Sequence, residues 1–208
     1  MTAEPFGTAR FIAFEGGEGC GKSTQARRLA TRLDAVLTRE PGGTALGVRL
    51  RELLLDPQTV ELAPRAEALL MAADRAQHVA EVVRPALADG RHVVSDRFAG
   101  SSLAYQGFGR GLAVEEVAHL SDWASVGLAP DLVILLVVSS DVARARLARQ
   151  LDRFEQEDPG FHQRVADGFT ALAAADPDRW VVIDGYGSVD EVADRVGDAV
   201  AQRLQLLR

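Results

Sequence analysis

The sequence predicts an α/β protein with three layers, α/β/α, in which helices cover both faces of a central five-stranded parallel sheet. Short apolar runs alternate along the chain with segments of helical spacing, and this β-α-β order is typical of parallel sheets. A chain of 208 residues, 47% of them hydrophobic, is long enough to form a large core in one domain, which we expect to span residues 1–208. Strands are predicted at residues 11–14, 35–38, 92–95, 132–138 and 180–183.

The helical segments follow from apolar spacing and from prolines. From Lys22 onward, apolar residues recur at helical spacing as far as Leu33. Residues 61–89 predict one long helix, which Pro64 begins and Pro85 kinks or ends. Residues 114–126 predict a further helix. We interpret Trp123 and Trp180 as side chains that pack against the sheet.

The first strand and the first helix enclose a glycine-rich loop. Residues 16–23 fit the pattern G-x-x-x-x-G-K-[ST] of the P-loop NTPases. At such a turn, backbone N–H groups and the positive end of the helix dipole surround a polyphosphate, Lys22 reaches the outer phosphates, and the Ser23 hydroxyl ligates Mg²⁺. The predicted ATP-binding residues are Gly16, Gly17, Glu18, Gly19, Cys20, Gly21, Lys22, Ser23 and Thr24.

Ligands of open parallel sheets bind beyond the carboxyl ends of the strands, so the residues that follow each strand are candidates. Asp96 closes the third strand, and we predict that it holds Mg²⁺ through water together with Ser23; the alternative is a carboxylate that caps a turn. Glu15 is the other acid at a strand end. An enzyme with two phosphorylated substrates also needs cations for the acceptor phosphate. Arginines at this edge, or on helices that lead from it, are Arg39, Arg51, Arg75 and Arg97.

The charge and composition of the chain indicate which partners it binds and in which cell compartment we expect it. The formal charge of −7 and the pI near 5.1 argue against general nucleic-acid binding, which needs a basic surface. We find no secretory leader and no apolar stretch of membrane-spanning length, so we expect a cytoplasmic protein without a membrane partner. The single cysteine, Cys20, cannot form an intramolecular disulfide. His78 and His119 lack metal-ligand spacing, so we predict no zinc site.

Beyond the glycine loop, the chain resembles the thymidylate kinases nearly from end to end. Residues 38–44 (TREPGGT), with Leu46, Gly47 and Arg51, are similar to a segment and the following helix of that family. Residues 72–78 resemble its base-binding helix, residues 96–107 its acceptor-site motif, and residues 151–157 the end of its lid. The resemblance implies transfer of the γ-phosphate of ATP to dTMP, which gives dTDP and ADP on the way to dTTP, with Mg²⁺ as cofactor and a homodimer as the assembly.

The resemblance also gives the acceptor-site residues roles. Glu18 would accept a hydrogen bond from the 3′-hydroxyl of dTMP, while Arg51 and Arg97 would hold its 5′-phosphate. Arg75 would face a thymine carbonyl, with Ser102 or Gln106 completing the base edge. Tyr105 would pack beneath the sugar and favour deoxyribose; the alternative is a core aromatic. The dTMP-binding residues implied are Glu18, Arg51, Met71, Arg75, Arg97, Ser101, Ser102, Tyr105 and Gln106.

Catalysis would consist of in-line transfer, with the transferred charge neutralised by cations. Lys22 and Arg97 would supply part of that charge. Because the loop carries no arginine between Gly16 and Lys22, the resemblance points to a lid at about residues 144–160, with Arg149 and Arg153 as catalytic arginines and Arg146 as a weaker candidate. Closure of this lid would exclude water.

The sequence departs from the family pattern in the lid, which is several residues short, and at single positions. Met71 stands where the family has a stacking Phe, while Val48 and Val137 replace acids. These changes leave open a degenerate nucleotide-binding paralogue with weak transfer activity. A second alternative is a deoxynucleoside kinase, whose acceptor carries no phosphate. A GTPase switch is disfavoured because no N-K-x-D segment is present. Helices 63–89 and 114–126 carry more apolar residues than one sheet face needs, a surplus that a homodimer interface would absorb.

Overall fold

The computed structural model describes residues 7–59, 62–146 and 152–207. Its centre is a parallel sheet of five strands in the order β2-β3-β1-β4-β5. The strands are β1 (Phe11–Glu15), β2 (Val36–Arg39), β3 (Val93–Asp96), β4 (Leu132–Val137) and β5 (Trp180–Asp184). The predicted sheet is confirmed, and each strand end lies within one residue of the prediction.

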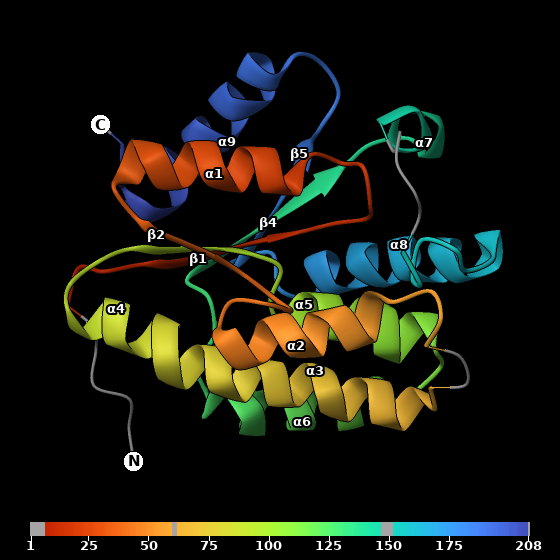
Figure 1. The fold of residues 1–208 in the computed structure, drawn as a ribbon. Helices are drawn as coiled ribbons and strands as arrows, with labels where there is room; N and C mark the ends of the chain where they lie inside the picture. The colour runs from red at the N-terminus through yellow and green to blue at the C-terminus, as the bar shows by residue number, and fades with distance from the viewer. Residues whose placement is uncertain (1–6, 60–61, 147–151, 208) are drawn as a thin grey trace.

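Helices cover both faces of this sheet, which confirms the three-layer prediction (Figure 1). On one face lie α1 (Lys22–Leu33) and α9 (Val189–Leu204), which pack on Ile12 and Phe14 of β1. The opposite face of β1 presents Phe11 and Ala13 to a second cluster. This alternation is the period of two expected of a strand buried on both faces. The other helices are α2 (Ala45–Leu55), α3 (Pro64–His78), α4 (Arg84–Ala88), α5 (Ala99–Ser102), α6 (Val114–Ser125), α7 (Ser140–Arg146) and α8 (Pro159–Ala175).

Two π-helical segments interrupt the helices on the second face. η1 (Val79–Val83) joins α3 to α4, so the long helix predicted for residues 61–89 runs from Pro64 to Ala88 and passes Pro85 without ending. A proline lacks an N–H and its ring crowds the preceding turn, and the wider π turn just before Pro85 accommodates both. η2 (Leu103–Gly109) follows α5 and carries Tyr105 and Gln106.

The two tryptophans differ in environment. Trp180 is 9% exposed and packs in the core, as predicted. Trp123 is 79% exposed, so the expectation that it packs against the sheet is wrong. Helical spacing identifies an apolar face but does not say which face turns to the sheet. Within the part of the chain that the structure describes, no helix is both long and apolar enough to cross a membrane.

Candidate active site

Most of the predicted site residues meet in one cavity of about 390 Å³ at the carboxyl ends of β1, β2 and β3; Gly16, Gly17 and Cys20 of the glycine loop are not in its lining. The glycine loop forms one wall, and α2, α3 and η2 supply residues to the others. The predicted residues that line the cavity are Glu18, Gly19, Gly21, Lys22, Ser23, Thr24, Arg51, Met71, Arg75, Asp96, Arg97, Ser101, Ser102, Tyr105 and Gln106.

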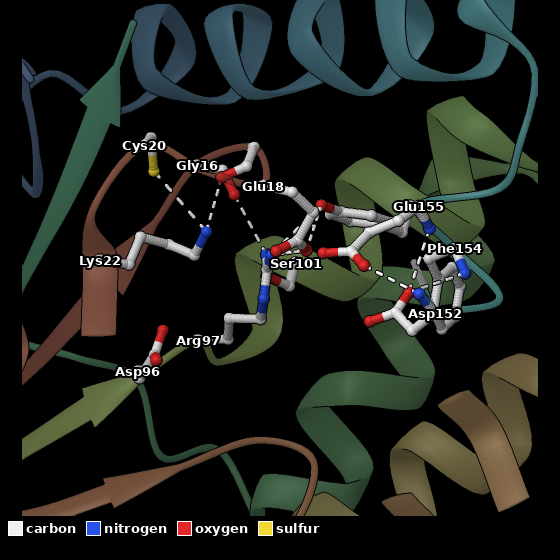
Figure 2. A network of polar contacts seen from close by, with 12 residues as sticks. Gly16, Glu18, Cys20, Lys22, Asp96, Arg97, Ser101, Asp152, Phe154 and Glu155 are labelled. Atoms are coloured by element: carbon white, nitrogen blue, oxygen red, sulfur yellow. Dashed lines mark hydrogen bonds and ion pairs between the residues drawn. The ribbon is translucent and has the colours of Figure 1, made fainter. Parts of the chain in front are cut away.

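The glycine loop requires its glycines. Gly16 has φ +137°, and a Cβ there would lie 2.4 Å from the carbonyl oxygen of Leu136. Lys22 is buried, and its ammonium group donates to the Gly17 carbonyl at 2.6 Å and lies 3.6 Å from Cys20 Sγ (Figure 2). Among the described residues, no side chain caps the first turn of α1 and no acid lies in it. The N–H groups and the positive dipole end are therefore free to bind an anion.

Ser23, in the first turn of α1, and Asp96, at the end of β3, form a hydrogen-bonded pair. Ser23 Oγ donates to Asp96 Oδ2 at 2.5 Å, while Asp96 Oδ1 is buried and has no hydrogen-bond partner among the described residues. An orphaned carboxylate oxygen next to a hydroxyl suits Mg²⁺, which keeps most of its ligands as water and phosphate oxygens. The described residues contain no cluster of three or more His, Cys, Asp or Glu residues that could enclose a metal ion.

Arg97 lies at the centre of the cavity's polar network. Its guanidinium donates to the Gly16 carbonyl at 3.1 Å and to Ser101 Oγ at 2.9 Å, and it forms an ion pair with Glu18. Tyr105 Oη accepts from it at 3.2 Å, and the guanidinium carbon lies 5.1 Å from the Tyr105 ring centre. Figure 2 shows Arg97 between the glycine loop and Ser101. Burial acts to lower the pKa of Arg97, but nearby negative groups, Glu18 first, raise it well above its ordinary value, so this side chain stays cationic.

Three arginines, Arg39, Arg51 and Arg97, line the part of the cavity next to Asp96. The pKa of Arg51 is lowered, first by burial and then by the positive charges of Arg39 and Arg97. All three line the cavity. Like charges held this close repel one another unless an anion lies between them. The arrangement therefore suits a dianionic phosphate.

The part of the cavity that Arg75, Met71 and Phe154 line has both polar and apolar groups, which suit a flat polar ligand. Arg75 is 2% exposed; its Nη1 and Nη2 atoms donate to Ser121 and Ser102, each at 3.0 Å, and its Nε donates to Glu40 at 2.9 Å. Met71 and Leu55 pack on the apolar cluster that includes Tyr105 and Phe154. Because Phe154 also lines the cavity, an aromatic ring faces this end even though Met71 stands at the predicted stacking position.

The structure does not bring all the predicted catalytic arginines to the cavity. Arg153 is outside its lining: its Nε donates to the Leu54 carbonyl at 2.8 Å, and its Nη1 pairs with the buried Glu67 at 2.7 Å. Arg149 lies outside the described residues. Arg146, the weaker candidate, lines the cavity, and its guanidinium donates to the carbonyls of Cys20 and Gly185 at 3.5 and 3.2 Å.

Glu15 has more hydrogen-bond partners near the site than its position at a strand end predicts. Its carboxylate is fully buried and accepts from the backbone N–H groups of Phe98 and Ser101, both at 3.0 Å, and from Ser101 Oγ at 2.5 Å. Burial raises its pKa to about 7, although the Ser101 bond and the positive charge of Arg97 oppose the rise. The signal was an acid at a strand end beside the glycine loop. Val48 and Val137, by contrast, are exposed and line no part of the cavity.

Known proteins that resemble this chain agree on one family. The family model described as thymidylate kinase matches residues 14–196. A thymidylate kinase of Synechococcus sp. (strain JA-3-3Ab) is 54% identical over 201 residues, which cover 93% of this chain and 96% of the relative. One from Trichlorobacter lovleyi is 45% identical and covers 93% and 98%. The crystal structure of thymidylate kinase from Ehrlichia chaffeensis superimposes with a TM-score of 0.78 at 31% identity, covering 92% of this chain and 98% of that one.

Proposed function

The chain belongs to the thymidylate kinase family, and from this membership we propose how its cavity transfers the γ-phosphate of ATP to dTMP. The reaction itself follows from the family; the residue roles, the metal and the assembly are proposals. The observation that carries them is the meeting, in one cavity, of an anion-binding glycine loop and the arginine cluster Arg39, Arg51 and Arg97. Neither alternative, a deoxynucleoside kinase or a degenerate paralogue, gains support from the comparisons.

On the donor side, the loop N–H groups and Lys22 bind the triphosphate of ATP. Lys22 must leave the Gly17 carbonyl to reach the outer phosphates, and this exchange of one acceptor for an anionic one is favourable. Ser23 and Asp96 would hold Mg²⁺. When bound there, the ion neutralises charge on the phosphates during transfer.

On the acceptor side, Arg51 and Arg97 bind the 5′-phosphate of dTMP, and Arg39 adds a third positive charge. Arg97 also touches the glycine loop through Gly16, so it lies where donor and acceptor phosphates meet. Glu18 accepts from the 3′-hydroxyl, Tyr105 closes the space beneath the sugar, and Ser101 holds Arg97 in place.

At the base end, Arg75 donates to a carbonyl of thymine. Ser102 fixes Arg75, and Gln106 and Met71 line the space for the ring. The described residues give Arg75 one partner for each of its three nitrogens, so the second hydrogens of Nη1 and Nη2 remain for a ligand.

The lid supplies the last cation. Among the described residues, Arg146 is the lid arginine that reaches the glycine loop, and we assign it the role first predicted for Arg153. Closure of the lid brings this charge to the γ-phosphate and excludes water.

The protein works as a cytoplasmic homodimer. Exposed apolar side chains on α3 and α6 support the dimer, because Leu69 is 59% and Trp123 79% exposed, and Val126 just beyond α6 is 72% exposed. Large exposed apolar groups are typical of interfaces between subunits. A single, buried cysteine is in keeping with a reducing compartment.

Steady-state kinetics of the purified protein tests this assignment. ADP formation should need Mg²⁺ and a deoxypyrimidine monophosphate, and Arg51→Ala or Arg97→Ala should raise KM for dTMP steeply while leaving KM for the unphosphorylated nucleoside unchanged. Equal turnover of adenylate or guanylate as acceptor would reject the substrate assignment. Binding of both nucleotides without transfer above background would favour the degenerate paralogue.

A further inference from the structure

His78, the last residue of α3, is fully buried, and both of its ring nitrogens are engaged. Nδ1 lies 2.8 Å from Glu40 Oε1, and Nε2 lies 2.7 Å from Thr38 Oγ1. One imidazole thus joins the end of α3 to the end of β2 and to the loop after it. His78 does not line the cavity, so any influence on the acceptor must pass through other residues.

Glu40 is the residue through which that influence passes. Its carboxylate is 4% exposed and bridges two partners: Oε1 contacts His78, and Oε2 accepts from Arg75 Nε at 2.9 Å. Arg75 is the side chain that faces the cavity's base end. Because a guanidinium is planar and rigid, a turn of the Glu40 carboxylate also turns the N–H groups that Arg75 presents to a ligand.

The same loop carries a second contact to the acceptor site. The Pro41 carbonyl accepts from Arg51 Nη1 at 3.0 Å, and Gly42 N–H donates to Asp74 Oδ1 at 3.0 Å. The ring of His78 packs directly on Gly43, where a Cβ would lie 2.6 Å from His78 Cδ2. Asp74 and His78 are one turn apart on α3, so one face of this helix fixes the loop that orients both Arg75 and Arg51.

We propose that His78 is a positioning residue for the acceptor nucleotide, which acts through the Nδ1 contact with Glu40 to orient Arg75 and, through the loop, Arg51. The inference rests on the proposed acceptor site. Among the described residues, the side-chain hydrogen bonds of His78 and Glu40 run to Thr38, to Arg75 and to each other, and none runs to the glycine loop or α1. The link to the donor side is the backbone bond from Glu40 N–H to the Asp96 carbonyl at 3.0 Å, which does not depend on the Nδ1 contact. Loss of the Nδ1 contact should therefore affect dTMP and spare ATP.

Two amide substitutions separate the ring nitrogens. His78→Asn places an amide nitrogen near the position of Nδ1, and His78→Gln places one near Nε2. We expect His78→Gln to raise KM for dTMP about tenfold, the effect of one lost hydrogen bond to a charged group. KM for ATP and kcat should stay within about twofold. His78→Asn, which keeps a donor near Nδ1, should have a KM for dTMP close to that of the wild type. Thr38→Val, which removes the Nε2 partner alone, should leave this KM unchanged.

A purely structural role gives a different pattern. Both amide variants leave one buried partner unsatisfied, so both should lower the melting temperature, and a structural role would change their KM values equally. Equal KM values for dTMP in the two variants would overturn the proposal, as would a rise in Thr38→Val. A rise in KM for dTMP in Thr38→Val would overturn the proposal even if His78→Gln does not fold. If the wild-type protein does not phosphorylate dTMP, the proposed function fails; if it does and only the variants disagree, this inference alone fails.

Discussion

Replacing Glu15 with Gln should change how the stability of the fold depends on pH. Burial raises the pKa of this carboxyl from 4.5 to about 7. In the unfolded chain the group ionises near the lower value, so between the two values the folded protein binds the extra proton. The contribution of Glu15 to stability is therefore fully present below about pH 4.5 and is lost as the pH rises through about 7, by roughly 3 kcal/mol in all. Glutamine does not titrate in this range, so the free energy of unfolding of Glu15→Gln should not show this fall with pH.

Urea unfolding of both proteins at pH 5, 6, 7 and 8 measures the effect. The free energy of unfolding of the wild type, relative to Glu15→Gln, should fall by about 2 to 3 kcal/mol from pH 5 to pH 8. Glu115→Gln, which removes an exposed carboxylate, is the matched control and should run parallel to the wild type. Asp74, whose pKa burial raises to about 6, titrates in both proteins and cancels in the comparison. Parallel curves for the wild type and Glu15→Gln would refute the reasoning.

Three further predictions concern the lid, the metal and the assembly. Arg146→Ala should lower kcat roughly 100-fold with little effect on stability. Arg153→Ala should lower the free energy of unfolding by about 2 to 3 kcal/mol, because it breaks a buried ion pair with Glu67. Kinetics and urea unfolding of both variants test this, and the reverse result would restore the catalytic role to Arg153. Asp96→Asn should raise the Mg²⁺ concentration for half-maximal activity at least tenfold, and an unchanged Mg²⁺ titration would remove Asp96 from the metal site. Trp123→Glu should shift the protein from dimer to monomer in sedimentation velocity while circular dichroism shows an unchanged fold, and an unaltered dimer would place the interface elsewhere.

Structural features could be predicted from the sequence where the neighbours of a residue in the chain determine its conformation or position. The glycine loop needs glycine at Gly16 because the chain passes within van der Waals contact of Leu136, and a motif of fixed spacing records this requirement. Asp96 and Arg97 were found because parallel strands deliver their carboxyl ends to one edge. These predictions depend on the neighbours of a residue in the chain.

Sequence reasoning was insufficient where partners are distant in the chain. Arg149 and Arg153 are equivalent by residue type, and Arg153 turns away from the cavity because the buried Glu67 of α3 binds it. No local pattern shows that Glu67 is there to receive it. In the same way, the apolar character of α6 is visible in the sequence, but whether Trp123 faces the sheet or solvent depends on how α6 packs against α3.

Arg97 shows how the fold maintains a strained residue in the wall of the cavity. Its φ of +75° lies in the left-handed region, which a side chain with a Cβ adopts at a cost of about 1 to 2 kcal/mol. Hydrogen bonds hold both of its backbone polar groups: its N–H donates to the Phe14 carbonyl at 2.9 Å, and its carbonyl accepts from the Ser95 side-chain hydroxyl at 2.7 Å. Glu15 then holds the following turn through Phe98 and Ser101. With this backbone conformation, one arginine contacts the glycine loop at Gly16 and Glu18 and also the helical segments that follow, at Ser101 and Tyr105.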